Sequence, residues 1–390
     1  LWRSRRMKKH STNFSDNKDS EEELEIYKEE EKFYRASQRQ LVWWKFKKHR
    51  LAMFALPLLI FLYLLAIFAD FFAPYSPETR FPNYLGVPPT RIYFSSEGKL
   101  QRPFVYDMKR ELDPKSFQFK FTENRTRKYP IRFFVEGESY KLLGFLSVNV
   151  HLFGTDSGGP PVFLFGTDTL GRCLLSRTLS GARISLSIGL VGVFLSFILG
   201  LILGGISGYF GGTIDEVIQR IIDFLISIPG IPLWMALSAS LPRNWSVVRT
   251  YFAITVILSL FGWCSLARVV RGKLLALREE DFVMAARLAG ASEWRIIMRH
   301  LLPSFASHLI VSITLSIPSM ILGETALSFL GLGMRPPAIS WGVLLQDAQE
   351  VIVVAQRPWQ LIPAFFVIVT VLLFNFLGDG LRDAVDPYAR

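Results

Sequence analysis

The chain lacks the residue patterns that mark most soluble enzymes. It has two cysteines in 390 residues, Cys173 and Cys264, and Cys264 lies in an apolar run, so a disulfide framework is not expected. No Gly-x4-Gly-Lys-Ser/Thr loop is present to hold the phosphates of ATP. The few histidines lack zinc-site spacing, and no Ser, His and Asp pattern predicts a catalytic triad. We therefore expect no catalytic residue, bound cofactor or metal ion in this chain.

Charged residues are also nearly absent from six long apolar runs. Half of the residues are hydrophobic and 14% are aromatic, which is unusual for a soluble domain. A run of about 20 apolar residues is long enough to cross a bilayer. The expected fold is therefore an all-α integral membrane protein with six transmembrane helices. These helices are expected approximately over 51–69, 184–206, 222–241, 251–267, 305–323 and 361–378.

Basic residues are unevenly distributed over the short connections between these runs. Seven Lys and Arg residues fall in 268–308, against one in 208–221 and two each in 242–250 and 324–360. Positively charged loops stay on the cytoplasmic side of a membrane. The 268–308 loop, and with it both termini, is therefore expected in the cytoplasm. The net charge of +11 is spread over loops rather than gathered into a stripe, so nucleic acid is not an expected partner.

The first 50 residues differ in composition from the apolar runs. Alternating acidic and basic residues predict a polar arm, and the stretch from Gln40 to Arg50 adds Trp43 and Trp44 to a basic cluster. Such a mixture suits a helix lying along the inner membrane interface. We expect 1–50 to be a cytoplasmic arm that leads into the first transmembrane helix.

A long polar segment, 70–165, separates the first two apolar runs. It is too long for a simple connection and contains short β-like runs bounded by turn residues. We expect a small β-rich extracytoplasmic insertion, followed by a five-helix core over 166–390. Contact with an external protein, capping of a pore and plain scaffolding remain open as its role. The β-like runs lie at 91–94, 117–121 and 131–135.

Several apolar runs contain residues that interrupt or thin a helix. Pro229 lies in the third run and Pro318 in the fifth, while Gly200 and Gly204 lie near the end of the second. Small residues permit close helix crossings, and broken backbone is tolerated where it lines a cavity. Two interpretations remain open, a bundle that rearranges around a pathway and ordinary tight packing.

The polar segment 281–303 reads DFVMAARLAGASEWRIIMRHLLP. Its spacing predicts a short amphipathic helix, a turn at Gly290 and a second amphipathic helix that ends at Pro303. Two such helices are too short to span a bilayer, but they fit a groove on another protein. The alternative is an amphipathic hairpin lying on the membrane surface.

Five motifs in order resemble one family of transport proteins. The 281–303 segment resembles the coupling loop of ATP-binding-cassette importer permeases. Met284 stands where that loop usually has glutamate, and the 70–165 segment is longer than usual. The other motifs are similar to those of the second permease subunit of oligopeptide, dipeptide and nickel importers. They are FGTDTLGRC at 165–173, ETALSFLGLG at 324–333, PPAISWG at 336–342 and LGDGLRDAVDP at 377–387.

The resemblance implies a non-catalytic permease subunit of the bacterial inner membrane. The implied partners are a second permease subunit, two ATPase subunits that bind ATP and Mg, an extracytoplasmic binding protein and membrane lipid. The loop 268–304 would contact the ATPases and transmit their movement to the bundle. The residues implied in this contact are Phe282, Met284, Ala285, Ala286, Gly290, Trp294, Ile297, Leu302 and Pro303.

The cargo and its path are less defined by the sequence. Peptides are the implied cargo, with oligosaccharides and metal chelates as alternatives. Glu324, Pro318 and Pro229 are candidates for the path or its gate, although the cap of a helix over the ALSFLGLG segment, or a role in packing, is the favoured interpretation of Glu324. An ion-coupled secondary transporter is the remote alternative, because neither internal repeats nor charges within the spans are found.

Overall fold

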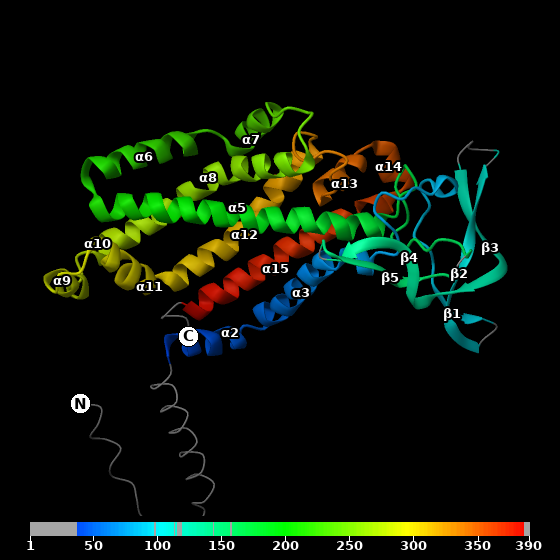
Figure 1. Cartoon of the computed structure of the whole chain (residues 1–390), viewed down its shortest axis with the longest axis horizontal. Coiled ribbons are helices and arrows are strands. Elements are labelled where there is room, and N and C mark those ends of the chain that lie inside the picture. The colour runs from blue at the N-terminus through cyan, green and yellow to red at the C-terminus, as the bar shows by residue number, and fades with distance from the viewer. Residues whose placement is uncertain are drawn as a thin grey trace, which may run out of the picture.

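The computed structural model describes residues 37–96, 99–112, 114, 119–142, 144–156 and 158–385. Most of the expected N-terminal arm, 1–36, lies outside these described residues. The described part is an elongated helical bundle with β structure at one end (Figure 1).

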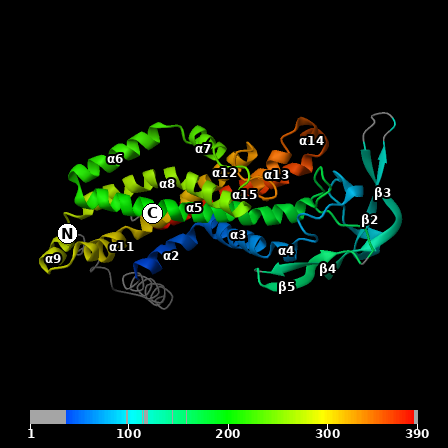
Figure 2. The ribbon, with the colours of Figure 1, turned by 45° about the horizontal axis from the view of Figure 1, so that its top comes forward.

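Five described helices are long and apolar enough to cross a membrane. The longest of them, α5 (Leu174–Phe210), lies beside α8 (Val247–Leu277) and extends to the β structure (Figures 1 and 2). The expectation of a helical membrane protein with a small β insertion is confirmed. The five helices are α3 (Arg50–Ile67), α5 (Leu174–Phe210), α8 (Val247–Leu277), α12 (Ala306–Phe329) and α15 (Ile362–Val385).

The run expected as one helix over 222–241 is broken instead. It forms parts of α6 (Gly212–Ser227) and α7 (Gly230–Ala239), which are bent by 85° relative to each other. Ile228 between them is extended, with φ −88° and ψ 129°. The ring of Pro229 disfavours the helical conformation of the residue before it, so a continuous helix over 222–241 is the wrong expectation.

Short helices connect and flank these spans. In α2 the Ser37 side chain accepts from the Gln40 N–H and forms a capping box, and Phe46 packs against Ala52 and Ala384. Half-exposed Trp43 and Trp44 lie on the same helix. The short helices outside 281–304 are α2 (Gln38–Lys48), α4 (Ala69–Phe72), η1 (Pro82–Tyr84), α13 (Trp341–Asp347), α14 (Val351–Gln356) and η3 (Pro358–Leu361).

The β insertion consists of two antiparallel sheets. One sheet has the strand order β1-β2-β3, and the other is the hairpin of β4 and β5. The strands extend well beyond the three expected runs, because backbone pairing continues through positions that are polar and exposed on both faces. Residues 117 and 118 of the expected second run lie outside the described residues. The strands are β1 (Tyr93–Ser96), β2 (Lys99–Leu112), β3 (Phe119–Pro130), β4 (Arg132–Leu142) and β5 (Leu146–Gly154).

An aromatic cluster joins the insertion to the start of α5. The Phe163 ring centroid lies 5.2 Å from that of Phe81, 5.6 Å from Tyr84 and 5.9 Å from Tyr75. The same cluster includes the buried side chain of Cys173, the residue before α5. Pairs of aromatic rings at these distances stabilise a structure beyond the effect of their buried area. The cluster therefore stabilises the contact between the insertion and the start of α5.

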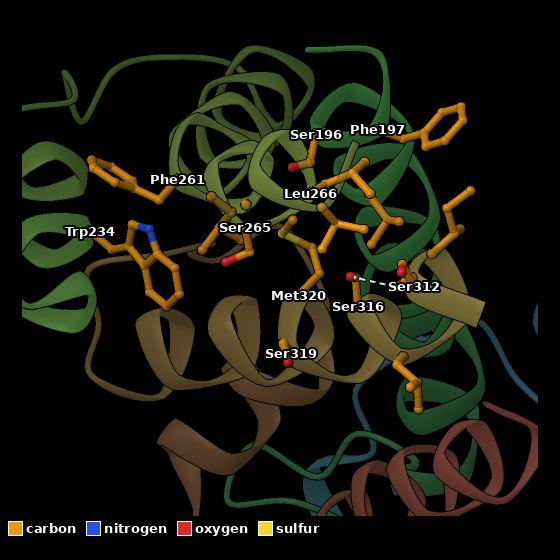
Figure 3. A pocket seen from close by; sticks show the side chains of 16 residues that line it. Ser196, Phe197, Trp234, Phe261, Ser265, Leu266, Ser312, Ser316, Ser319 and Met320 are labelled. Atoms are coloured by element: carbon orange, nitrogen blue, oxygen red, sulfur yellow. Dashed lines mark hydrogen bonds between the residues drawn. The ribbon is translucent and has the colours of Figure 1, made fainter. Parts of the chain in front are cut away.

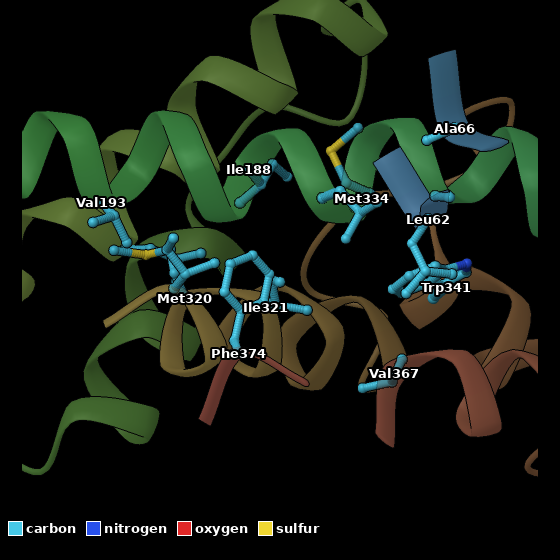
Figure 4. Close-up of a cluster of buried hydrophobic side chains, with 14 of the residues drawn as sticks. Leu62, Ala66, Ile188, Val193, Met320, Ile321, Met334, Trp341, Val367 and Phe374 are labelled. Atoms are coloured by element: carbon cyan, nitrogen blue, oxygen red, sulfur yellow. The ribbon is translucent and has the colours of Figure 1, made fainter. Parts of the chain in front are cut away.

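The main apolar core lies where α3, α5, α12 and α15 meet (Figure 4). Leu62, Ile188, Ile321 and Phe374 each come from a different one of these helices, and all are buried. The helices α5 and α8 also cross closely. A Cβ on Gly204 of α5 would lie 2.5 Å from the carbonyl oxygen of Ala267 in α8. The expected close approach of helices at glycine is therefore confirmed.

The two ends of the bundle differ in character. The β insertion occupies one end, while α2, the end of α15 and the 281–304 segment lie at the other (Figure 1). The described ends of the chain are thus on the same side as the polar loop.

Candidate functional site

The loop between α8 and α12 folds as the expected helix, glycine turn and helix. It comprises α9 (Asp281–Leu288), α10 (Glu293–Arg295), a π-type turn (Ile296–Leu301) and α11 (Leu302–Ser304). Gly290 has φ +77°, and the following N–H of Ala291 donates to the Ala286 carbonyl at 3.0 Å. This left-handed position after a helix end favours glycine.

The second helix of the hairpin widens before its end. The Leu302 N–H donates to the carbonyl of Ile297, five residues back. Pro303 has no N–H for an ordinary helical bond, and a π-type turn is one way in which a helix adapts to this. The helix ends at Ser304, one residue beyond the expected Pro303.

The inner face of the hairpin has its own apolar core. Val283, Ile296 and Leu301 are fully buried, and they pack with Leu274 of α8 and Tyr209 of α5. The candidate residues Ala286, Ile297 and Leu302 are half-buried against this core. The hairpin therefore packs on the ends of α5 and α8, so a displacement of the hairpin is transmitted to these two helices.

The outer face of the hairpin exposes large apolar side chains. Leu288 is 88% exposed and Trp294 is 70% exposed, beside the partly exposed Phe282, Met284 and Met298. Sequence reasoning named neither Leu288 nor Met298. The signal was available, because each lies four residues after a candidate, Met284 or Trp294, and therefore on the same helix face. Ala285, Gly290 and Pro303 are exposed as well.

An ion pair holds the neighbouring helices together behind the hairpin. The Arg271 guanidinium of α8 donates to both carboxylate oxygens of Asp215 in α6, each at 2.5 Å. The Ser207 hydroxyl of α5 donates to the same carboxylate. Bidentate geometry fixes orientation as well as distance, so these three helices are linked near the hairpin.

A cavity of about 440 Å³ lies among α5, α7, α8 and α12. Figure 3 shows Ser265 of α8 and Met320 of α12 projecting into the space between their helices. The indole N–H of Trp234, from α7, has no hydrogen-bond partner among the described residues. Apolar walls with a few hydroxyls are typical of a site for a small solute. The serines of the lining are Ser196, Ser265, Ser312, Ser316 and Ser319.

Comparison with known proteins assigns the family. Residues 197–390 match the family described as binding-protein-dependent transport system inner membrane component, and 37–89 match the N-terminal TM domain of oligopeptide transport permease C. The dipeptide transport system permease protein DppC of Bacillus subtilis is 40% identical over 227 residues, 58% of this chain and 69% of that protein. DppC of Lactococcus lactis subsp. cremoris is 33% identical over 353 residues, 90% of each chain.

The chain belongs to this permease family. It is a multi-pass inner-membrane component, as expected from the motifs. Among solved structures, the MetNI methionine ABC transporter in an inward-facing conformation is similar with a TM-score of 0.42 at 20% identity, over 54% of this chain and 96% of that chain.

The remaining candidate residues of the permease lie apart from one another. Pro229 lies at the break between α6 and α7, and Pro318 is buried inside α12. Glu324 is fully buried, also inside α12, and none of the three lines the cavity. The alternative of Glu324 as the cap of a separate helix is wrong, because α12 continues through it to Phe329.

The Glu324 carboxylate instead connects two of the permease's motifs to α5. It accepts hydrogen bonds from Ser185 of α5 at 3.1 Å and from Ser328 at 2.8 Å. The Ser185 hydroxyl also accepts a hydrogen bond from the backbone N–H of Trp341 at 3.1 Å. ETALSFLGLG and PPAISWG are therefore held together on one helix through buried polar bonds, which stabilise only when fully partnered.

The FGTDTLGRC motif forms a buried charge cluster near the start of α5. Asp168 accepts from the side chain of Arg172 at 2.6 Å and pairs with Arg177 at 3.3 Å. Asp347 of α13 lies 3.7 Å from Arg172 and 3.8 Å from Arg177. Burial raises the pKa of Asp347, against the opposing effect of Arg172. Asp168 thus organises the turn before α5, and the helix begins at Leu174.

Proposed function

We propose that this permease forms half of the path through which an ATP-driven importer takes up peptides. A second permease subunit forms the other half, and an extracytoplasmic binding protein delivers the cargo. Two partner ATPases bind ATP and Mg and hydrolyse the nucleotide. The names of the relatives, which describe dipeptide and oligopeptide transport, support peptides as cargo.

The proposed topology has six crossings with both termini in the cytoplasm. The bent pair α6 and α7 supplies the sixth crossing as a broken span. The excess of basic residues over 268–308 supports a cytoplasmic hairpin. Residues 1–50 are then a cytoplasmic arm, 51–69 the first span, 70–165 an external insertion and 166–390 the core.

The exposed apolar face of the hairpin is the observation that carries the proposal. The largely exposed side chains of Leu288 and Trp294 are costly to leave in water, and exposed apolar patches with aromatic residues mark protein contacts. This face, with Phe282 and Met284, is proposed to seat in a cleft of the ATPase. Because the hairpin's inner face packs on α5 and α8, closure of the ATPases then moves those helices.

The serine-lined cavity is proposed as this subunit's share of the path. A peptide offers carbonyl and N–H groups along its whole length, and serine hydroxyls with the Trp234 N–H match these without selecting a side chain. Selection then falls to the binding protein.

The test is ATPase activity of the complex, co-purified and placed in lipid. We expect stimulation when the binding protein is loaded with peptides, and none with oligosaccharides or metal chelates. Stimulation by one of the latter classes would keep the importer and replace its cargo. Uptake by this chain without any ATPase would instead favour an ion-coupled transporter.

A variant tests the hairpin directly. Trp294→Ala should weaken retention of the ATPases in the purified complex more than tenfold, as expected for a central aromatic contact. Phe94→Ala is the matched control, because Phe94 is an aromatic residue 58% exposed in the β insertion. Equal retention in the two variants would contradict the proposed contact.

A further inference from the structure

The β4–β5 hairpin turns back toward the bundle instead of pointing away from it. Figure 2 shows it running beside α4 in the direction of α3. Its tip, with Gly144 and Lys141, lines a cavity together with Tyr63 and Ile67 of α3 and Leu190 of α5. Tyr63 lies one turn inside the apolar α3 helix, so the tip reaches the depth of the membrane-spanning segments.

The tip itself is apolar. Phe145 is 79% exposed and Leu146 is 51% exposed at the turn of the hairpin. Side chains of this kind are costly in water but stable within a lipid leaflet. Gly144 of the tip lines the same cavity as Ile67 of α3, and the side chain of Ile67 is exposed as well.

The cavity under the tip has a cationic rim and apolar walls. Its volume is about 450 Å³. At the rim lie Lys141 and Arg183, and below them the walls include Leu186 and Leu190. Leu190 follows Arg183 by seven residues, which is about 10 Å along a helix. The cavity therefore extends from the charged rim into the apolar depth of the bundle.

The two cations of the rim are differently engaged. Arg183 donates to the carbonyl oxygens of Ala66 at 2.8 Å and Ile67 at 3.1 Å, and pairs with Asp70 at 2.8 Å. Its guanidinium thus caps the end of α3, where Asp70 balances its charge. Lys141 pairs with no described carboxylate, so the rim keeps one positive charge.

We propose that this cavity binds an anionic glycerophospholipid of the leaflet nearest the β insertion. The phosphate would lie between Lys141 and Arg183, and an acyl chain would follow Leu186 and Leu190. The apolar hairpin tip inserts in the same leaflet and covers the lipid. The β insertion is in this way anchored to the membrane as well as to α5. This site is separate from the serine-lined cavity and from the cytoplasmic hairpin.

The first test measures the depth of the hairpin tip in the full complex. A spin label is attached at Phe145→Cys, and for comparison at Leu100→Cys, which replaces an 89% exposed residue of the three-stranded sheet. The two native cysteines are buried and should not react. In phosphatidylglycerol vesicles the label at 145 should collide with oxygen more than with a water-soluble nickel chelate, and the label at 100 should do the reverse. Equal nickel access at both positions would overturn membrane insertion and leave the tip for a protein partner.

The second test measures lipid binding to the detergent-purified complex by native mass spectrometry. Phosphatidylglycerol should be retained over phosphatidylcholine, and Lys141→Gln should reduce this preference about fivefold, the effect of one lysine at an anionic surface. Lys99→Gln, an equal change of charge in the three-stranded sheet, should leave the preference unchanged. Equal retention of both lipids, or no effect of Lys141→Gln, would overturn the site. Displacement by soluble glycerol 3-phosphate would show a phosphate site that needs no acyl chain and would overturn the lipid assignment.

Discussion

At the residue scale, Asp168 pairs with Arg172 and with Arg177 near the start of α5. Its side chain and that of Arg177 are almost completely buried, at 4% and 2% exposed. A buried ion pair contributes little relative to apolar packing, but removal of one partner leaves the other charge without compensation. The Leu170 N–H and the Arg172 N–H also donate to Asp168, each at 2.9 Å.

We therefore predict that Asp168→Asn lowers the free energy of unfolding by about 3 kcal/mol, because Arg177 stays buried and loses its nearest carboxylate. Thermal unfolding of the purified complex measures the change. Asp156→Asn is the control, since Asp156 pairs with Arg132 at 2.8 Å while both side chains are about half exposed. That exposed pair should contribute less than about 1 kcal/mol. Similar shifts in both variants would argue against a special role of the buried pair.

At the scale of the element, the hairpin between α8 and α12 depends on the backbone conformation of Gly290. A Cβ at this position would meet no atom within 4 Å, so only the left-handed φ of +77° opposes a side chain. A β-branched residue is strongly disfavoured there, whereas asparagine tolerates the conformation. The turn can therefore be altered without a steric clash elsewhere.

Gly290→Val should uncouple ATP hydrolysis from transport while membrane insertion stays intact, because the turn that orients the two helices is lost. Gly290→Asn should keep most of the coupling. Gly212→Val is the matched control, since Gly212 has φ +57° and equally open surroundings but is the first residue of α6. The measurement is peptide uptake per ATP hydrolysed in proteoliposomes. Unchanged coupling in Gly290→Val would contradict the role of the turn.

Elements with strong local signals were predictable from the sequence. The hairpin has a glycine at the helix end, a serine cap at Ser292 and apolar spacing that agree with one another. The break between α6 and α7 had a local signal in Pro229, but neither that proline nor an average of hydropathy over 222–241 predicts the 85° angle between the two helices. The strands β3 and β4 were underestimated because most of their side chains face solvent on both sides, which removes the alternation that marks a strand.

At the scale of the whole molecule, contacts between distant motifs were beyond sequence reasoning. Ser185 and Trp341 are 156 residues apart, and no local spacing predicts that a hydrogen bond joins them. The same holds for Asp347 beside Arg172 and for the return of Lys141 to the end of α3. These contacts depend on how the helices cross, and the crossing depends on side-chain packing along the whole length of α5.

The α5–α8 crossing offers the sharpest test at this scale, because adjacent glycines differ in their surroundings. A Cβ on Gly204 would lie 2.7 Å from the Cα of Ala267, whereas one on Gly205 would meet nothing within 4 Å. Gly204→Ala should separate the two helices and lower the free energy of unfolding by about 2 kcal/mol, as overpacking does. Gly205→Ala should be neutral or stabilising by about 0.5 kcal/mol, since alanine favours the helix.

Because α8 leads directly into the hairpin at 281–304 and α5 begins next to the β insertion, the loss in Gly204→Ala should reach both ends of the molecule. Thermal unfolding reports the change in stability, and peptide uptake reports the change in function. Both should fall in Gly204→Ala and stay near the native values in Gly205→Ala. A stable and active Gly204→Ala protein would show that the crossing tolerates a wider spacing, and the rigid α5–α8 pair could then not be what transmits movement from the hairpin to the cavity.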